Sequence, residues 1–235
     1  MERTGGCIVA QWKIPKHFPV KGVVFDMDGL MLDTERVIMH SWDITGDKLG
    51  YENFGNNIYH TLGMSRKQRD SYLLEKYGND FPLQNFIDEY HRIYREYEKN
   101  YGIPKKKGLV SLLEYLKNQQ IPMAVATSTH QMYSIPGLEA QGILSYFQKV
   151  ITGDMVKKGK PNPEIYQKAC EALGVVPEEA LALEDYYNGI RSACKAGMKV
   201  IMIPDLLVDE EPVRECLYGK MESLSMVEEW LKDES

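Results

Sequence analysis

Short, unbroken apolar runs alternate with helical patterns along most of the chain, and this alternation limits the folds that it can adopt. The runs are rich in Val, Ile and Ala, which is typical of strands covered on both faces. Five runs stand out, at residues 20–25, 122–127, 149–152, 180–184 and 199–203. Helical spacing of apolar residues follows at 109–120, 163–174 and 188–198. Strands that alternate with helices predict an α/β fold with a doubly wound parallel sheet.

One long segment interrupts the alternation. From about Glu35 to about Lys107 no strand pattern occurs, and candidate helices cover 35–49, 65–77 and 83–100. Ser65 and Gln68 have the spacing of a capping box at the start of the second helix. Lys105 to Lys107 are interpreted as a solvated linker back into the core. The predicted organisation is an N-terminal extension (1–19), a core (20–34 and 108–235) and an all-helical cap domain (35–107) inserted after the first strand.

Composition and charge exclude several classes of partner. The chain has 235 residues and a formal charge of −6, which argues against nucleic acid and anionic membranes as main partners. It contains no apolar stretch long enough to span a membrane, and its start lacks the apolar core of a signal peptide. The four cysteines have neither zinc-site nor disulfide-framework spacing. We therefore expect a cytoplasmic protein with reduced thiols, and a monomer.

Polar residues of a particular kind follow the apolar runs. Asp26 and Asp28 follow the first run, Thr127, Ser128 and Thr129 end the second, and Glu184 and Asp185 end the fourth. Lys160 stands ahead of Pro161, after the third run. In open α/β sheets the ligand site lies beyond the carboxyl ends of the strands. We therefore expect these residues to converge, although they are far apart in the sequence.

The residue types indicate phosphoryl chemistry. Carboxylates are hard oxygen ligands that suit Mg²⁺, and hydroxyl and backbone N–H groups suit phosphate oxygens. A lysine can neutralise phosphate and lower the pKa of a neighbouring carboxylate. Of two adjacent aspartates, one can be an ionised nucleophile and the other a general acid and base. The alternatives are that the aspartates only cap a turn, that Thr127 and Ser128 are ordinary strand-end residues, and that Lys160 is solvated.

The stretch DMDGLMLDTE (26–35) resembles the DxDGxLxDTE signature of the haloacid dehalogenase superfamily, in its phosphatase branch. The resemblance extends in the same order to ATST (126–129), GKPNPEIY (159–166) and LEDYYNGIRSACKAGM (183–198). It implies a Rossmann-like core, a small helical cap, bound Mg²⁺ and an aspartyl-phosphate intermediate.

The resemblance also implies a role for each matching residue. Asp26 matches the nucleophile and Asp28 the acid/base, whose backbone carbonyl also faces the metal, while Thr34 matches a residue that positions the acid/base. The predicted metal site consists of Asp26, Asp28, Glu184 and Asp185, with Glu184 either a direct ligand or a partner of one. The predicted phosphate site consists of Thr127, Ser128 and Lys160, and Lys160 is also a candidate catalytic residue.

Three positions, compared with the patterns of this family, bear on substrate specificity. Tyr186 and Tyr187 replace the serine and proline common in this branch, which affects the packing of the loop and the size of the pocket. Arg66 lies in GMSRKQ, similar to a GxSR pattern that carries a substrate-binding arginine in β-phosphoglucomutase-like proteins, and a solvated arginine is the alternative. Where mutases of that type carry a histidine, this chain has Ile38. His40 lies two residues further on, which rotates it by roughly 200° on a helix.

These features predict a Mg²⁺-dependent phosphatase that acts on a small phosphomonoester, either a sugar phosphate or a nucleotide-like metabolite. The nearest alternative is a mutase similar to β-phosphoglucomutase. A haloacid dehalogenase proper is disfavoured, because that chemistry uses one aspartate and no Mg²⁺. A non-catalytic binding scaffold is the alternative outside the enzymes.

Overall fold

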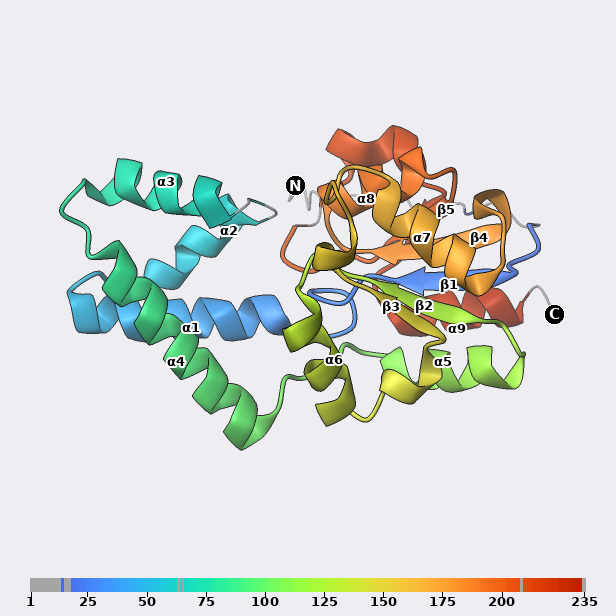
Figure 1. Cartoon of the computed structure of the whole chain (residues 1–235), viewed down its shortest axis with the longest axis horizontal. Coiled ribbons are helices and arrows are strands. Elements are labelled where there is room, and N and C mark those ends of the chain that lie inside the picture. The colour runs from blue at the N-terminus through green and yellow to red at the C-terminus, as the bar shows by residue number, and fades with distance from the viewer. Residues whose placement is uncertain (1–13, 15–17, 63, 65, 208, 234–235) are drawn as a thin grey trace, which may run out of the picture.

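The computed structural model describes residues 14, 18–62, 64, 66–207 and 209–233. In this part of the chain six parallel strands form one sheet in the order β3-β2-β1-β4-β5-β6 (Figure 1). The strands are β1 (Gly22–Phe25), β2 (Met123–Ala126), β3 (Lys149–Ile151), β4 (Ala180–Glu184), β5 (Lys199–Met202) and β6 (Gly219–Lys220). This is the strand order of a doubly wound Rossmann fold, in which ligands bind where the order reverses, next to β1 and β4.

The α-helices of the described residues fall into two groups. Four follow β1 directly: α1 (Thr34–Leu49), α2 (Ile58–Thr61), α3 (Arg66–Tyr77) and α4 (Leu83–Tyr101). The others alternate with the later strands: α5 (Leu109–Asn118), α6 (Gln131–Ala140), α7 (Glu164–Leu173), α8 (Tyr187–Lys195) and α9 (Leu224–Lys232). None of the helices in the described residues combines the length and the apolar character needed to cross a bilayer.

Apolar side chains from β1 point alternately to the two faces of the sheet. Val23 and Phe25 belong to a core cluster with leucines of α5 and α9, whereas Val24 belongs to a second cluster with α7 and α8. Figure 1 shows α5 and α9 below the sheet and α7 and α8 above it. Both faces are therefore covered, which explains why the strands read as continuous apolar runs.

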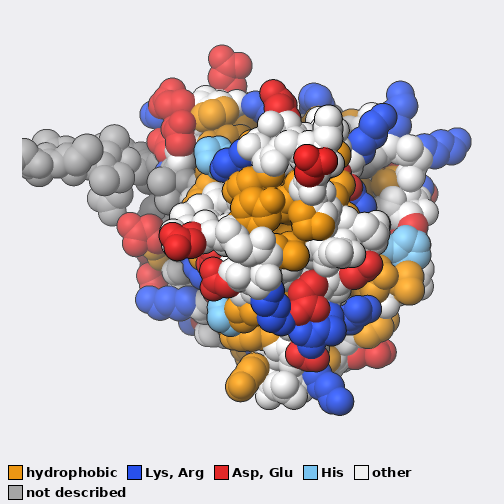
Figure 2. All heavy atoms as spheres, turned by 90° about the vertical axis from the view of Figure 1, so that its left-hand side faces the viewer, with side chains coloured by type: hydrophobic (Ala, Val, Ile, Leu, Met, Phe, Trp, Pro, Cys, Tyr) orange, Lys and Arg blue, Asp and Glu red, His pale blue; other side chains and the backbone are white. Residues whose placement is uncertain are grey.

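Helices α1 to α4 (residues 34–101), here called the helical segment, lie beside the sheet (Figure 1). They have a separate apolar cluster, formed mainly by aromatic rings around Trp42, Phe54 and Phe86. Trp42 packs edge-on against Phe86, with ring centroids 5.3 Å apart. Figure 2 shows the outer end of this segment, where hydrophobic side chains gather at the centre between charged ones. The helical segment therefore has an apolar cluster of its own, which the core contacts through Leu206 in the loop after β5.

Two connections join the helical segment to the core, and they lie side by side. The Asp33 N–H donates to the Pro104 carbonyl at 2.8 Å, and the Lys106 N–H donates to the Met31 carbonyl at 2.9 Å. Lys106 Nζ also donates to Asp205 Oδ1 at 2.5 Å. Its side chain is only 19% exposed, so the interpretation of Lys105 to Lys107 as a solvated linker is wrong for Lys106.

Asp205 ties both connections to the loop that follows β5. Its side chain is 2% exposed, and Oδ1 accepts hydrogen bonds from Lys106 and from Arg36 in the first turn of α1. Arg36 also donates to Asp33 at 2.7 Å. One buried carboxylate therefore pairs with cations from both connections, which holds the start of the helical segment against the core.

The predicted fold class is confirmed. The five expected strands occur within two residues of the predicted bounds, and the helices expected at 35–49, 65–77 and 83–100 correspond to α1, α3 and α4. The strand β6 and the helices α2, α6 and α9 were not predicted. The capping box depends on Ser65, which lies outside the described residues, as does most of the expected N-terminal extension.

Candidate active site

The polar residues predicted to converge follow parallel strands, and the sheet brings their carboxyl ends to one edge. Asp26 follows β1, Thr127 follows β2, and Asp185 follows Glu184 at the end of β4. Backbone hydrogen bonds extend the ladder to these positions, because the Asp26 N–H donates to Leu183 and the Thr127 N–H donates to Ile151, each at 3.0 Å. The side chains therefore start from fixed backbone positions at the point where the strand order reverses.

Lys160 joins three of these strand ends. Its Nζ donates to Asp26 Oδ1 at 2.5 Å, to Glu184 Oε1 at 2.7 Å and to the Ala126 carbonyl at 2.9 Å. The side chain is 7% exposed. Burial lowers the pKa of Lys160, but Asp26 and Glu184 outweigh it and raise that pKa above its ordinary value. Lys160 is therefore a fixed positive charge inside the site, and its interpretation as a solvated surface lysine is excluded.

Three buried carboxylates gather beside Lys160. Oxygens of Asp26, Glu184 and Asp185 lie within 4.8 Å of one another. Burial raises the pKa of Asp26 well above its ordinary value, although Lys160 opposes the shift. Burial, with the charges of Asp26 and Glu184, also raises the pKa of Asp185. Buried carboxylates that repel one another at this spacing fit a hard divalent cation, which would offset their charge.

Two glycines let the backbone approach these carboxylates. Gly189 lies against the carboxylate of Glu184, and a Cβ at that position would collide with it. Gly29 has a φ of +84° and lies against the carboxylate of Asp185. A side chain at Gly29 would therefore be strained by the backbone angle and would also displace Asp185. Both glycines belong to the motifs DMDGLMLDTE and LEDYYNGIRSACKAGM. The close contacts with the carboxylates explain why these positions carry glycine.

Asp28 lies beside the cluster, and its carboxylate has different partners. Oδ2 accepts from Thr129 Oγ1 at 2.7 Å and is 3.4 Å from Thr127 Oγ1. Burial raises the pKa of Asp28, while Thr129 and the buried Thr34 oppose the shift. The carboxylate of Asp28 is not among the three that gather as a possible metal site in the described residues. Thr129, in the motif ATST, was expected at this strand end, but its bond to Asp28 was not predicted.

Tyr166 is a site residue that sequence reasoning missed. Its hydroxyl donates to Glu184 Oε1, the same oxygen that accepts from Lys160. The Lys160 ammonium also lies 5.1 Å from the centre of the Tyr166 ring. Tyr166 is the last residue of the motif GKPNPEIY, which also contains Lys160. Its place in this motif was the sequence feature that could have identified it as a site residue. Its effect is to fix the orientation of the Glu184 carboxylate.

The helical segment reaches the site through α1 and α4. Burial, reinforced by Asp28 and then Asp205, raises the pKa of Glu35 to about 8. Burial and then Asp28 raise the pKa of Tyr94. The charge of Asp28 therefore acts on a residue of α1 and on a residue of α4, which couples the helical segment electrostatically to the site.

Ser128 and Arg66 lie outside the buried network. Ser128 is exposed, and its backbone packs against Gly153. Arg66 is exposed at the start of α3. Burial lowers the pKa of His91 in α4, and the charges of Arg69 and then Arg66 lower it further. Arg66 therefore belongs to a group of positive charges on the helical segment, separate from Lys160.

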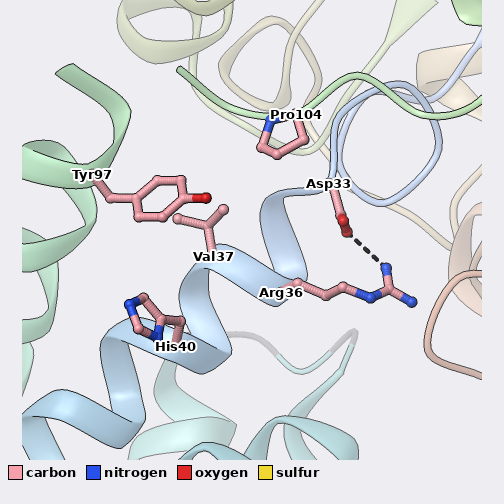
Figure 3. Close-up of a pocket in the computed structure, with 6 residues that line it drawn as sticks. All are labelled: Asp33, Arg36, Val37, His40, Tyr97 and Pro104. Carbon is pink, nitrogen blue, oxygen red and sulfur yellow. Dashed lines mark hydrogen bonds and ion pairs between the residues drawn. The ribbon is translucent and has the colours of Figure 1, made fainter. Parts of the chain in front are cut away.

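A pocket of about 260 Å³ lies at the connection between the helical segment and the core, lined by Asp33, Arg36, Val37, His40, Tyr97 and Pro104 (Figure 3). The His40 ring lies 6.0 Å from the ring of Tyr97. Ile38 packs against the apolar cluster of the helical segment instead. His40 therefore faces this pocket, which Ile38 does not line.

Comparison with known proteins places the chain in a family. A model of haloacid dehalogenase-like hydrolases matches residues 23–203. A phosphorylated carbohydrates phosphatase of Thermotoga maritima is 31% identical over 186 residues, covering 77% of this chain and 84% of that protein. A phosphoglycolate phosphatase of Thiobacillus denitrificans is 30% identical over 193 residues, covering 79% and 84%.

A solved structure agrees with this assignment. It is a Thermotoga maritima protein described as a candidate β-phosphoglucomutase, with a TM-score of 0.77 and 27% identity, covering 91% of this chain and 99% of that one. The predicted resemblance is thus confirmed at the level of sequence and of fold. The chain belongs to the haloacid dehalogenase-like hydrolases.

Proposed function

We propose that the chain is a Mg²⁺-dependent phosphatase that hydrolyses a small phosphomonoester through an aspartyl phosphate on Asp26. The observation that carries the proposal is the buried network in which Lys160 bonds Asp26 and Glu184 at the carboxyl ends of the strands. A structural ion pair would need one carboxylate, whereas this lysine bonds two members of a cluster of three. The names of the two phosphatases that resemble the chain support the same reaction class.

In this proposal Asp26 attacks phosphorus, and Lys160 and Thr127 stabilise the equatorial oxygens. Ser128 supplies a further polar contact to phosphate from the same loop. Glu184, Asp185 and Asp26, with the backbone carbonyl of Asp28, would hold Mg²⁺. When bound, the cation neutralises charge on the phosphoryl oxygens and keeps Asp26 ionised.

Asp28 is the proposed general acid and base. It protonates the leaving alkoxide, and then takes a proton from the water that cleaves the aspartyl phosphate. The raised pKa of Asp28 supports the first role, because a higher pKa favours the protonated carboxyl that donates to the leaving group. Thr129 and Thr127 both bond Oδ2 of Asp28, which fixes the orientation of its carboxylate.

The helical segment is the proposed cap, with the domain bounds 35–107 for the cap and 20–34 and 108–235 for the core. Glu35 and Tyr94 support this role, because the pKa of each responds to Asp28. A cap of this kind excludes bulk water and contacts the part of the substrate beyond the phosphate. Removing residues 35–107 and measuring hydrolysis of a large and a small ester would test the bounds.

Hydrolysis is proposed in preference to a mutase reaction. The likeness to a candidate β-phosphoglucomutase favours the mutase as the second candidate. Ile38 and the orientation of His40 toward the pocket at the connection support hydrolysis, because no histidine of α1 then links cap closure to Asp28. Water is the expected acceptor for the phosphoryl group.

The test is a panel of phosphorylated metabolites assayed with Mg²⁺, including β-glucose 1-phosphate with a trace of glucose 1,6-bisphosphate. We expect inorganic phosphate from several monoesters, and no glucose 6-phosphate that forms faster than free phosphate. Rapid isomerisation with little free phosphate would show a mutase. No turnover of any ester would favour the non-catalytic scaffold.

Arg66 is proposed to hold the distal part of the substrate. A charged hydrogen bond of this kind is worth enough for Arg66→Ala to raise KM for the best substrate by about tenfold or more. The variant should leave KM for phenyl phosphate, which lacks a distal group, nearly unchanged. Lys67→Ala, at the next exposed position of α3, is the matched control. Equal effects on both substrates would assign Arg66 to the surface.

The expected cytoplasmic location and monomeric state stay predictions of the sequence. Cell fractionation would test the first, and size-exclusion chromatography with light scattering would test the second. A partner class of small phosphorylated metabolites follows from the proposed reaction. Neither nucleic acid nor membrane is expected to bind, which a titration with duplex DNA and with anionic vesicles would check.

A further inference from the structure

Tyr186 makes a bond that joins the core to the helical segment. It follows Asp185 directly, and its hydroxyl donates to the main-chain carbonyl of Leu62 at 2.6 Å. Leu62 is the C-cap residue of α2. The loop that carries a carboxylate of the acidic cluster is thus fastened to the helical segment only four positions before Arg66.

Tyr187 provides a natural comparison for this bond. Its hydroxyl also donates to a main-chain carbonyl, that of Asp209 at 2.8 Å, but Asp209 belongs to the core loop after β5. The two rings stack with centroids 5.3 Å apart and planes inclined by 27°. Stacking limits the directions in which the Tyr186 ring can point, so the hydroxyl is already aimed when the helical segment lies against the core.

Other contacts place the same two surfaces together but act at different points. Leu206, in the loop after β5, packs against the apolar cluster of the helical segment. Asp205, in the same loop, pairs with Arg36 at the start of α1. These contacts hold α1 and the centre of the segment, whereas the Tyr186 bond holds the end of α2, from which the chain continues to α3.

We propose that Tyr186 is a positioning residue that fixes the α2 and α3 side of the helical segment over the loop of Asp185. It thereby favours substrates whose distal group contacts that side. The proposal rests on the proposed function for the substrate, but the bond itself does not depend on it.

The test compares Tyr186→Phe with Tyr187→Phe, since each removes one hydroxyl and keeps the stacked rings. Hydrogen–deuterium exchange of the full chain is the first readout and needs no substrate. We expect faster exchange of amides in α2 and α3 in Tyr186→Phe, with the core strands unchanged. Tyr187→Phe should exchange in α2 and α3 as the wild type does. Equal exchange in both variants would overturn the proposal.

The second readout is selectivity. A net hydrogen bond of ordinary strength corresponds to a loss of about two- to tenfold in kcat/KM for the best sugar phosphate in Tyr186→Phe. The same variant should retain wild-type kcat/KM for phenyl phosphate. A similar loss for both substrates would show a general structural role and contradict the proposal. If the wild type hydrolyses no ester, the proposed function fails, and the exchange measurement still decides the role of Tyr186.

Discussion

Asp26→Asn is expected to lose turnover by more than about a thousandfold while the fold is kept, since removal of a catalytic nucleophile has effects of at least this size. The neutral amide cannot attack phosphorus. The substitution changes one side-chain atom at the end of β1, and the backbone hydrogen bonds of the strand remain. We therefore expect the protein to stay folded. Steady-state phosphate release measures the loss, and circular dichroism with thermal unfolding checks the fold.

Asp80→Asn is the matched control for this variant. Asp80 is exposed in the turn between α3 and α4, so the same chemical change there should leave turnover as in the wild type. Turnover by Asp26→Asn within tenfold of the wild type would remove Asp26 as the nucleophile.

Removal of divalent cations is expected to abolish hydrolysis, and addition of Mg²⁺ should restore it. The carboxylates of Asp26, Glu184 and Asp185 repel one another, and without a cation Asp26 and Asp185 keep raised pKa values, which weakens the nucleophile. Ca²⁺ should restore activity poorly, because it accepts 6–8 ligands in loose geometry whereas Mg²⁺ demands near-octahedral geometry. Undiminished hydrolysis in excess EDTA would refute the metal site.

Cation binding can also be measured without activity. Mg²⁺ should raise the unfolding temperature of the wild type, because a ligand that binds the folded state stabilises it. Asp185→Asn should abolish this rise, since it removes one charge from the cluster. A rise of the same size in both proteins would place the cation elsewhere.

Much of the site could be predicted because the carboxyl ends of parallel strands lie at the same edge of the sheet. Asp26, Thr127 and Asp185 are adjacent to apolar runs, so the location of each run also located the residue. The position of Lys160 depends on a loop whose path the sequence does not predict, so only its motif identified it as a site residue. The same reasoning predicted the fold class, since buried strands are apolar on both sides.

The contacts that were missed join residues that no local pattern connects. Thr129 bonds Asp28 from another strand end, and Tyr166 bonds Glu184 from α7. Asp205 pairs with Lys106, which lies 99 positions away in the sequence, and no local pattern at either residue predicts this pair. The two-residue strand β6 is too short to show periodicity. Tyr186 was noted as a departure, but its bond to Leu62 required the placement of the helical segment.

The measurement that tests the central proposal most directly is the location of the phosphoryl group during turnover. Asp28→Asn mixed with phenyl phosphate and Mg²⁺, quenched in acid and analysed by peptide mass spectrometry, should carry one phosphoryl group on Asp26. The leaving phenolate needs little protonation, whereas cleavage of the aspartyl phosphate lacks its base, so the intermediate accumulates. Phosphate release with no phosphoryl group on Asp26, or with the group on Thr127 or Ser128, would contradict the account.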